Sequence, residues 1–99
     1  MARYNVYSVS PGGIFVIDVQ AELLDNLGTR VVVPLLLKSE ISTPLKDLNP
    51  TFDIAGNQYV MVTQAIASIP VKSLRTLITS LREHQDVIVR ALDMLLSGY

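Results

Sequence analysis

The stretch that decides the fold is residues 4–19, YNVYSVSPGGIFVIDV. Its two halves, residues 4–9 and 14–19, are rich in aromatic and β-branched side chains, which favour β-strands. Residues 10–13 between them, Ser-Pro-Gly-Gly, form a turn signal. The stretch therefore predicts a β-hairpin with a four-residue loop. It places the chain in a mostly-β class.

Strand character continues along the chain. Four further segments have it: residues 29–37, 51–54, 58–63 and 63–70. Pro34 has no N–H to donate to a ladder, so we expect it at an edge, a bulge or a bend. Residues 20–28 fit one short helical turn or a compact loop, which Gly28 can close, and residues 38–50 an irregular excursion. Residues 71–78 stay ambiguous, because their apolar spacing is helical while their surroundings favour strands.

Residues 80–99 predict a single helix that stops two residues before the chain does. Ser80 and Glu83 fit a capping box, in which the Ser80 hydroxyl accepts from the Glu83 N–H. Apolar residues then cover roughly 220° of the helix, whereas one packing face needs only about 100°. A narrow polar stripe remains, formed by Asp86, Arg90, Asp93 and Ser97. The fold predicted is a small β-barrel of about five antiparallel strands with one C-terminal α-helix.

Composition limits the possible functions. With 99 residues, the chain is expected to form one domain over residues 1–99. It is 49% hydrophobic and only 17% charged, against about 25% charged in ordinary globular proteins, which favours an oligomer over a compact monomer. A net charge of −1 without a Lys/Arg cluster argues against direct nucleic-acid binding.

The expected location is the cytoplasm, because the chain has no cysteine and shows no secretory leader. We also expect no membrane span. The longest apolar run, residues 31–37, is far shorter than the roughly 20 residues that a bilayer requires.

The chain is poorly equipped for catalysis. His84 is the only histidine, so neither a Ser-His-Asp triad nor a multi-histidine metal site is expected. The carboxylates form no pair spaced for acid–base chemistry. The best cation for a site is Arg30, which could hold a phosphate or carboxylate bidentately; alternatively it forms a structural ion pair with Asp18 or Asp25. We therefore predict no catalytic residue, no metal and no cofactor.

Three segments carry a family resemblance. Residues 18–25, DVQAELLD, followed by residues 29–35, TRVVVPL, resemble the signature of the CcdB toxins of toxin–antitoxin modules. Residues 67–71, ASIPV, resemble that family's small-Ser-aliphatic-Pro-Val segment. The resemblance covers nearly the whole chain, including the C-terminal helix. It implies a homodimer with an SH3-like barrel, the fold shared with the MazF and Kid toxins.

The resemblance also implies a target and an antidote. CcdB-like toxins poison DNA gyrase by gripping its dimerised gyrase A protein and trapping the covalent complex with cleaved DNA. A CcdA antitoxin neutralises them with a disordered segment that folds on binding. The gyrase contact is expected on the segment after DVQ and on the stripe and tip of the C-terminal helix. In this chain these positions are Ala21, Leu23, Leu24, Asp93, Ser97, Gly98 and Tyr99.

Two of these positions depart from the family's well-known member, which has tryptophan where this chain has Ser97 and isoleucine where it has Tyr99. The residues themselves support the same surface in part. Asp93 lies near the C-terminal end of its helix, where the macrodipole disfavours an anion. Leu23 and Leu24 are adjacent, so at least one of them is expected to be exposed. The two-sided apolar arc, together with the resemblance, places Met94 and Leu95 near a dimer seam.

Two alternatives to a gyrase poison remain open. One is a MazF-like endoribonuclease, in which Arg30 would stabilise the scissile phosphate. The other is a homologue that binds an antitoxin without acting on gyrase, which Ser97 in place of the tryptophan leaves possible.

Overall fold

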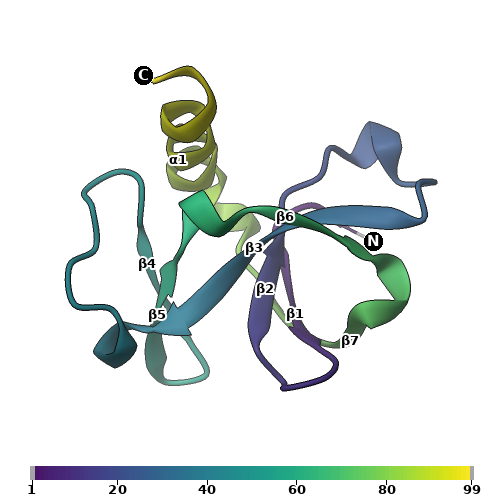
Figure 1. Cartoon of the computed structure of the whole chain (residues 1–99), viewed down its shortest axis with the longest axis horizontal. Coiled ribbons are helices and arrows are strands. Elements are labelled where there is room, and N and C mark those ends of the chain that lie inside the picture. Colours follow the sequence, from purple (N-terminus) through teal and green to yellow (C-terminus); the bar gives the residue numbers. More distant parts are fainter. Residues whose placement is uncertain (1, 99) are drawn as a thin grey trace.

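The computed structural model describes residues 2–98, which form a curled, antiparallel half-barrel with one C-terminal helix (Figure 1). Among them are seven strands in one sheet, ordered β4-β5-β3-β2-β1-β7, with β6 paired to β3. The strands are β1 Asn5–Val9, β2 Phe15–Asp18, β3 Thr29–Leu37, β4 Thr51–Ile54, β5 Asn57–Met61, β6 Ala67–Pro70 and β7 Leu74–Ser80. The helix is α1 Gln85–Ser97. Short 3₁₀ turns occupy residues 22–24, 38–40, 63–65, 71–73 and 82–84.

The predicted hairpin is confirmed, because β1 and β2 pair antiparallel with Val6 opposite Ile17. The mostly-β class with one C-terminal helix is also confirmed and is consistent with an SH3-like fold. The sheet has seven strands rather than about five. The ambiguous residues 71–78 fall mainly on the strand side, since most of them enter β7, which pairs along the open edge of β1. Residues 63–70 begin as a 3₁₀ turn and become strand β6 only at Ala67.

Pro34 lies inside the central strand β3, opposite Val16 of β2. On the other edge of β3, pairing with β6 ends at Val32 and pairing with β5 starts at Leu35. The Pro34 carbonyl accepts from Val62 N–H at 2.9 Å on that same edge. Because the nitrogen and oxygen of one residue face the same edge of a strand, the missing N–H falls where β3 changes partner.

The start of α1 differs from the prediction, whereas its end agrees. Ser80 is the last residue of β7, and its hydroxyl accepts from Arg82 N–H at 3.2 Å rather than from Glu83. The next N–H, that of Leu81, bonds to the Tyr4 carbonyl at 2.8 Å, so the sheet holds this stretch and the helix begins only at Gln85. The predicted capping box was therefore wrong. At the other end Gly98 adopts a φ of 78° and its N–H bonds to Met94 O, a glycine C-cap.

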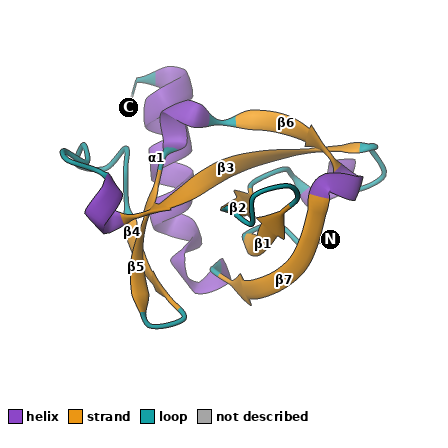
Figure 2. Ribbon diagram, turned by 60° about the horizontal axis from the view of Figure 1, so that its bottom comes forward, coloured by secondary structure: helices purple, strands orange, loops and turns teal. Residues whose placement is uncertain are grey.

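The main core lies between the inner face of the curled sheet and α1 (Figure 2). The helix contributes Ile88, Ala91 and Leu92, which pack with residues of β1 to β5 such as Val6 and Ile17. Its second apolar side is exposed, with Leu96 the most open residue at 73%. Of the two apolar sides predicted for the helix, one is thus buried within the chain. No helix within residues 2–98 is long and apolar enough to cross a membrane.

A buried ion pair joins β2 to β3. Arg30 and Asp18 are fully buried, and the Arg30 Nε and Nη2 donate to Asp18 Oδ2 at 3.0 and 2.6 Å. The third contact runs from Arg30 Nη1 to Asp25 Oδ1 at 2.7 Å. Burial raises the pKa of the Asp18 carboxyl above its usual value, while the Arg30 guanidinium and the Gln20 N–H oppose that shift. Ionised Asp18 therefore depends on Arg30 to offset its loss of water.

Replacing Arg30 tests this dependence. Arg30→Ala should lower the free energy of unfolding by about 3–5 kcal/mol, because it leaves a buried carboxylate without its cation. Urea denaturation followed by circular dichroism measures the change. Arg82→Ala is the matched control, since Arg82 pairs with Glu22 at 3.2 Å on the surface and such pairs contribute at most about 1 kcal/mol. Equal losses for the two variants would contradict a structural role for Arg30.

Candidate functional site

The connection between β2 and β3 exposes its leucines. We call residues 21–27 the leucine segment; it contains the 3₁₀ turn Glu22–Leu24, in which no residue is buried. Leu23 is 92% exposed and Leu24 48%. The prediction that at least one of them would be exposed is confirmed, and Leu27 is also exposed. Three open leucines in one short segment add little to the core and suit a contact with another molecule.

The leucine segment lies beside the C-terminal half of α1. A pocket of about 310 Å³ is shared by the two elements. It is lined by Arg3, Val19, Gln20, Ala21, Leu24, Val31, Ile66, Val89, Leu92, Asp93 and Leu96. Three of the predicted site residues, Ala21, Leu24 and Asp93, are thereby brought together.

The other predicted residues do not line this pocket. Leu23, Ser97 and Gly98 are exposed, and Tyr99 lies outside the described residues. Sequence reasoning missed Leu96 and Arg3 as site residues. Leu96 could have been found, since it belongs to the apolar arc that exceeds one packing face. Arg3 gave no signal; its Nε donates to Val19 O at 3.0 Å and its guanidinium lies 4.9 Å from the centre of the Tyr4 ring.

The lining of this pocket contains one cation, Arg3, and one anion, Asp93, among mainly apolar side chains. Asp93 is exposed near the C-terminal end of α1, whose last turn carries no basic residue. No residue in the range 2–98 forms an ion pair with it. An unpaired carboxylate beside exposed leucines is suited to binding a partner, since apolar area contributes affinity and a charge contributes orientation.

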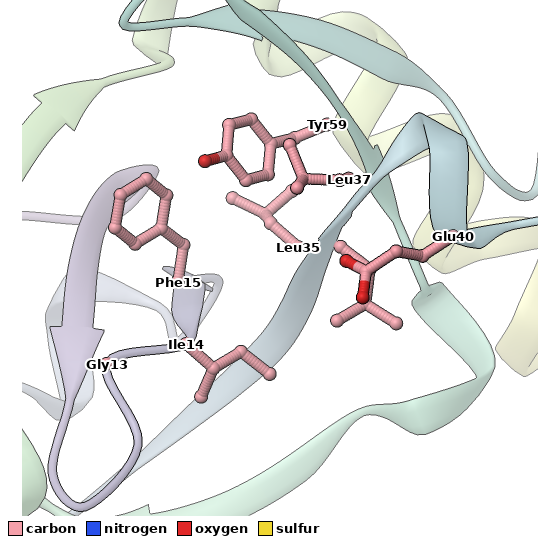
Figure 3. A pocket seen from close by; sticks show the side chains of 8 residues that line it. Gly13, Ile14, Phe15, Leu35, Leu37, Glu40 and Tyr59 are labelled. Carbon is pink, nitrogen blue, oxygen red and sulfur yellow. The ribbon is translucent and has the colours of Figure 1, made fainter.

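A second pocket, of about 370 Å³, lies between the β1–β2 loop and the end of β3 (Figure 3). It is lined by Gly13, Ile14, Phe15, Leu35, Leu36, Leu37, Glu40 and Tyr59. The rings of Phe15 and Tyr59 lie 5.2 Å apart between centroids. Glu40 is the one carboxylate of this lining, so the pocket has no pair of carboxylates for acid–base chemistry.

Arg30 is not available at the surface. It is fully buried, and its contacts with Asp18 and Asp25 satisfy both ion-pair alternatives at once. An RNA phosphate could reach it only if these contacts were broken. Residues 2–98 also contain no group of three or more His, Cys, Asp or Glu side chains able to hold a metal ion.

A family comparison agrees with this fold. The model of the CcdB protein family matches residues 3–98. This span includes the DVQ segment, the leucine segment, the Arg30 strand and all of α1. CcdB proteins are toxins of toxin–antitoxin modules. The match covers nearly the whole chain, which therefore belongs to the CcdB family.

Proposed function

We propose that this protein is a toxin that binds the gyrase A protein of DNA gyrase, traps the complex of gyrase with cleaved DNA, and is neutralised by a CcdA-like antitoxin. It would act in the cytoplasm as a single toxin domain over residues 1–99. The observation that carries the proposal is the shared pocket: Ala21 and Leu24 of the leucine segment meet Asp93 of α1. These are the two places where the family resemblance puts the gyrase contact.

The proposed mechanism is binding without catalysis. A ligand shifts an equilibrium only by the difference in its affinity for the two states. The toxin must therefore bind the cleaved-DNA state of gyrase more tightly than the resting state. Burying a fully exposed leucine contributes roughly 1.5–3 kcal/mol, and Leu23 is almost fully exposed. We infer that Leu23 and Leu96 provide the apolar anchors that Ser97 does not.

We also propose a homodimer. Met94 and Leu95 are half-buried on α1, beside exposed Leu96. The apolar surplus of the chain needs a second surface to cover it, and a second copy supplies one with matching chemistry. A dimer would present two leucine segments to the dimerised gyrase A protein. The ribonuclease alternative is not favoured, because its only candidate cation, Arg30, is buried.

Expression in bacterial cells tests the gyrase proposal. The native chain should arrest growth and cause double-strand DNA breaks. Leu23→Ser, and separately removal of Gly98 and Tyr99, should abolish both effects. Leu23→Ser should change the free energy of unfolding by less than about 0.5 kcal/mol, because the side chain is exposed. Leu77→Ser is the matched control; Leu77 is exposed on β7 and its loss should leave toxicity intact.

Three results would contradict the proposal. RNA cleavage without DNA breaks would indicate a ribonuclease. Growth unaffected by the native chain, together with binding of a CcdA-like peptide, would indicate a homologue that binds only an antitoxin. Toxicity lost equally in Leu23→Ser and Leu77→Ser would show that the leucine segment has no special role.

Replacing Asp93 should change stability and binding in opposite directions. Asp93→Asn removes an anion from the unfavourable end of the macrodipole and should raise the free energy of unfolding by about 0.3 kcal/mol. The same change should weaken binding to the purified gyrase A protein, measured by isothermal titration calorimetry. Asp86→Asn is the control with opposite sign, since Asp86 lies in the first turn of α1 and its charge is stabilising there. A stabilising Asp93→Asn that binds as tightly as the native chain would remove Asp93 from the site.

The dimer is tested by sedimentation velocity. The native chain should sediment as a dimer at micromolar concentration, and Met94→Glu should sediment as a folded monomer because a charge at the seam would lose its water. Leu45→Glu is the control, since Leu45 is exposed in the irregular segment after β3. A native chain that stays monomeric at all concentrations would refute the dimer.

A further inference from the structure

The leucine segment keeps a defined conformation without a core of its own. None of the residues 21–27 is buried, and Leu23 makes almost no packing contact. Polar contacts from buried side chains therefore contribute to holding its turn. Resting on the proposed function, we propose that Gln20 is a positioning residue, which together with the Arg30–Asp25 contact holds the leucine segment ready for its partner.

Gln20 holds the middle of the segment. Its side chain is only 6% exposed. The amide Nε2 donates to the Leu24 carbonyl at 2.8 Å, and Oε1 accepts from Val31 N–H at 2.9 Å. One buried amide thus bridges the 3₁₀ turn to the start of β3. A side chain that is both donor and acceptor is needed, because one of its partners is a carbonyl and the other an N–H.

Arg30 holds the far end. Its Nη1 donates to Asp25 Oδ1 at 2.7 Å, and the Asp25 side chain is 44% exposed. Asp18 connects Gln20 with Arg30. Its Oδ1 accepts from the Gln20 N–H at 3.0 Å, and its Oδ2 accepts from Arg30. The buried ion pair is thus connected to the exposed segment in two places. Gln20 bonds to Leu24, and Arg30 bonds to Asp25. Asp18 and Gln20 are two of the three residues of the DVQ segment.

A further contact of the segment, on the surface, is weak by comparison. Glu22 pairs with Arg82 at 3.2 Å, but both side chains are more than half exposed, and exposed ion pairs contribute little. A loop that samples several conformations binds more weakly by the fraction of time that it spends in the competent one. Gln20 should therefore act on affinity by keeping that fraction near one.

Hydrogen exchange tests the positioning directly and needs no partner. In the native chain the N–H groups of Leu24 and Asp25 bond to Ala21 O and Glu22 O, so they should exchange slowly. Gln20→Met keeps the size of the side chain and removes both hydrogen bonds. It should speed exchange at Leu24, Asp25 and Leu27 by about tenfold or more relative to amides of β1. Gln58→Met is the matched control, since Gln58 is exposed on β5.

Binding to the purified gyrase A protein provides the second readout. Gln20→Met should raise the dissociation constant by the factor by which it lowers the fraction of time that the segment spends in the binding-competent conformation. In a Leu23→Ala background the same substitution should raise the dissociation constant by a much smaller factor, because the leucine side chain that Gln20 positions is absent. A merely structural role would give equal losses in both backgrounds. If Gln20→Met does not fold, Asp25→Asn replaces it and should show the same pattern with a smaller effect.

The outcomes separate this inference from the proposed function. Unchanged exchange at residues 24–27 in Gln20→Met and Asp25→Asn overturns the positioning role, whether or not gyrase binds. Equal losses of affinity with and without Leu23 overturn it as well. A native chain that fails to bind the gyrase A protein, while exchange in Gln20→Met rises, refutes the gyrase proposal and supports the positioning of the segment for another partner.

Discussion

The ion pair between Arg30 and Asp18 is the constraint on which the rest of this structure depends. Both residues are fully buried, and a buried charge is tolerated only when it is paired and hydrogen-bonded. The pair fixes β2 against β3 at the point where the chain leaves β2 for the leucine segment. Replacing both residues with apolar ones could preserve a core, but it would remove the acceptor for the Gln20 N–H and the donor to Asp25. The buried Arg30–Asp18 pair is thus linked to the exposed leucine segment.

The apolar surplus of the chain has a corresponding explanation in the helix. α1 buries Ile88, Ala91 and Leu92 against the sheet and leaves Leu96 open. The leucine segment leaves Leu23 open, and it borders one pocket with α1, with Leu24 and Leu96 in the lining. Exposed leucines add little to the folded state, whereas a partner that covers them gains their full burial. Part of the excess hydrophobicity is therefore found at this surface.

Local patterns predicted what local forces decide. The hairpin of residues 4–19 and the helix end at Ser97 are both confirmed, and a short turn and a glycine cap, both local, form them. The capping box failed because Ser80 belongs to β7, whose pairing with β1 joins residues 75 positions apart. Pro34 sits in a central strand because β3 changes partner there, which no window of the sequence reveals. The strand at residues 74–80 likewise required knowledge of an open edge on β1.

The candidate site shows the same division at the level of single residues. Adjacent leucines after a strand predicted exposure, and a carboxylate near a helix end predicted a position that stability does not explain. Gln20 gave no such signal, since a glutamine beside a strand is usually solvated. Its importance arises from burial between the Leu24 carbonyl and the Val31 N–H, two groups that approach only after β2 and β3 have paired. The function proposed for this protein is binding, which requires an apolar surface held in place rather than reactive groups. The buried polar residues Gln20 and Arg30 contact the segment that carries this surface, and Asp18 contacts both of them.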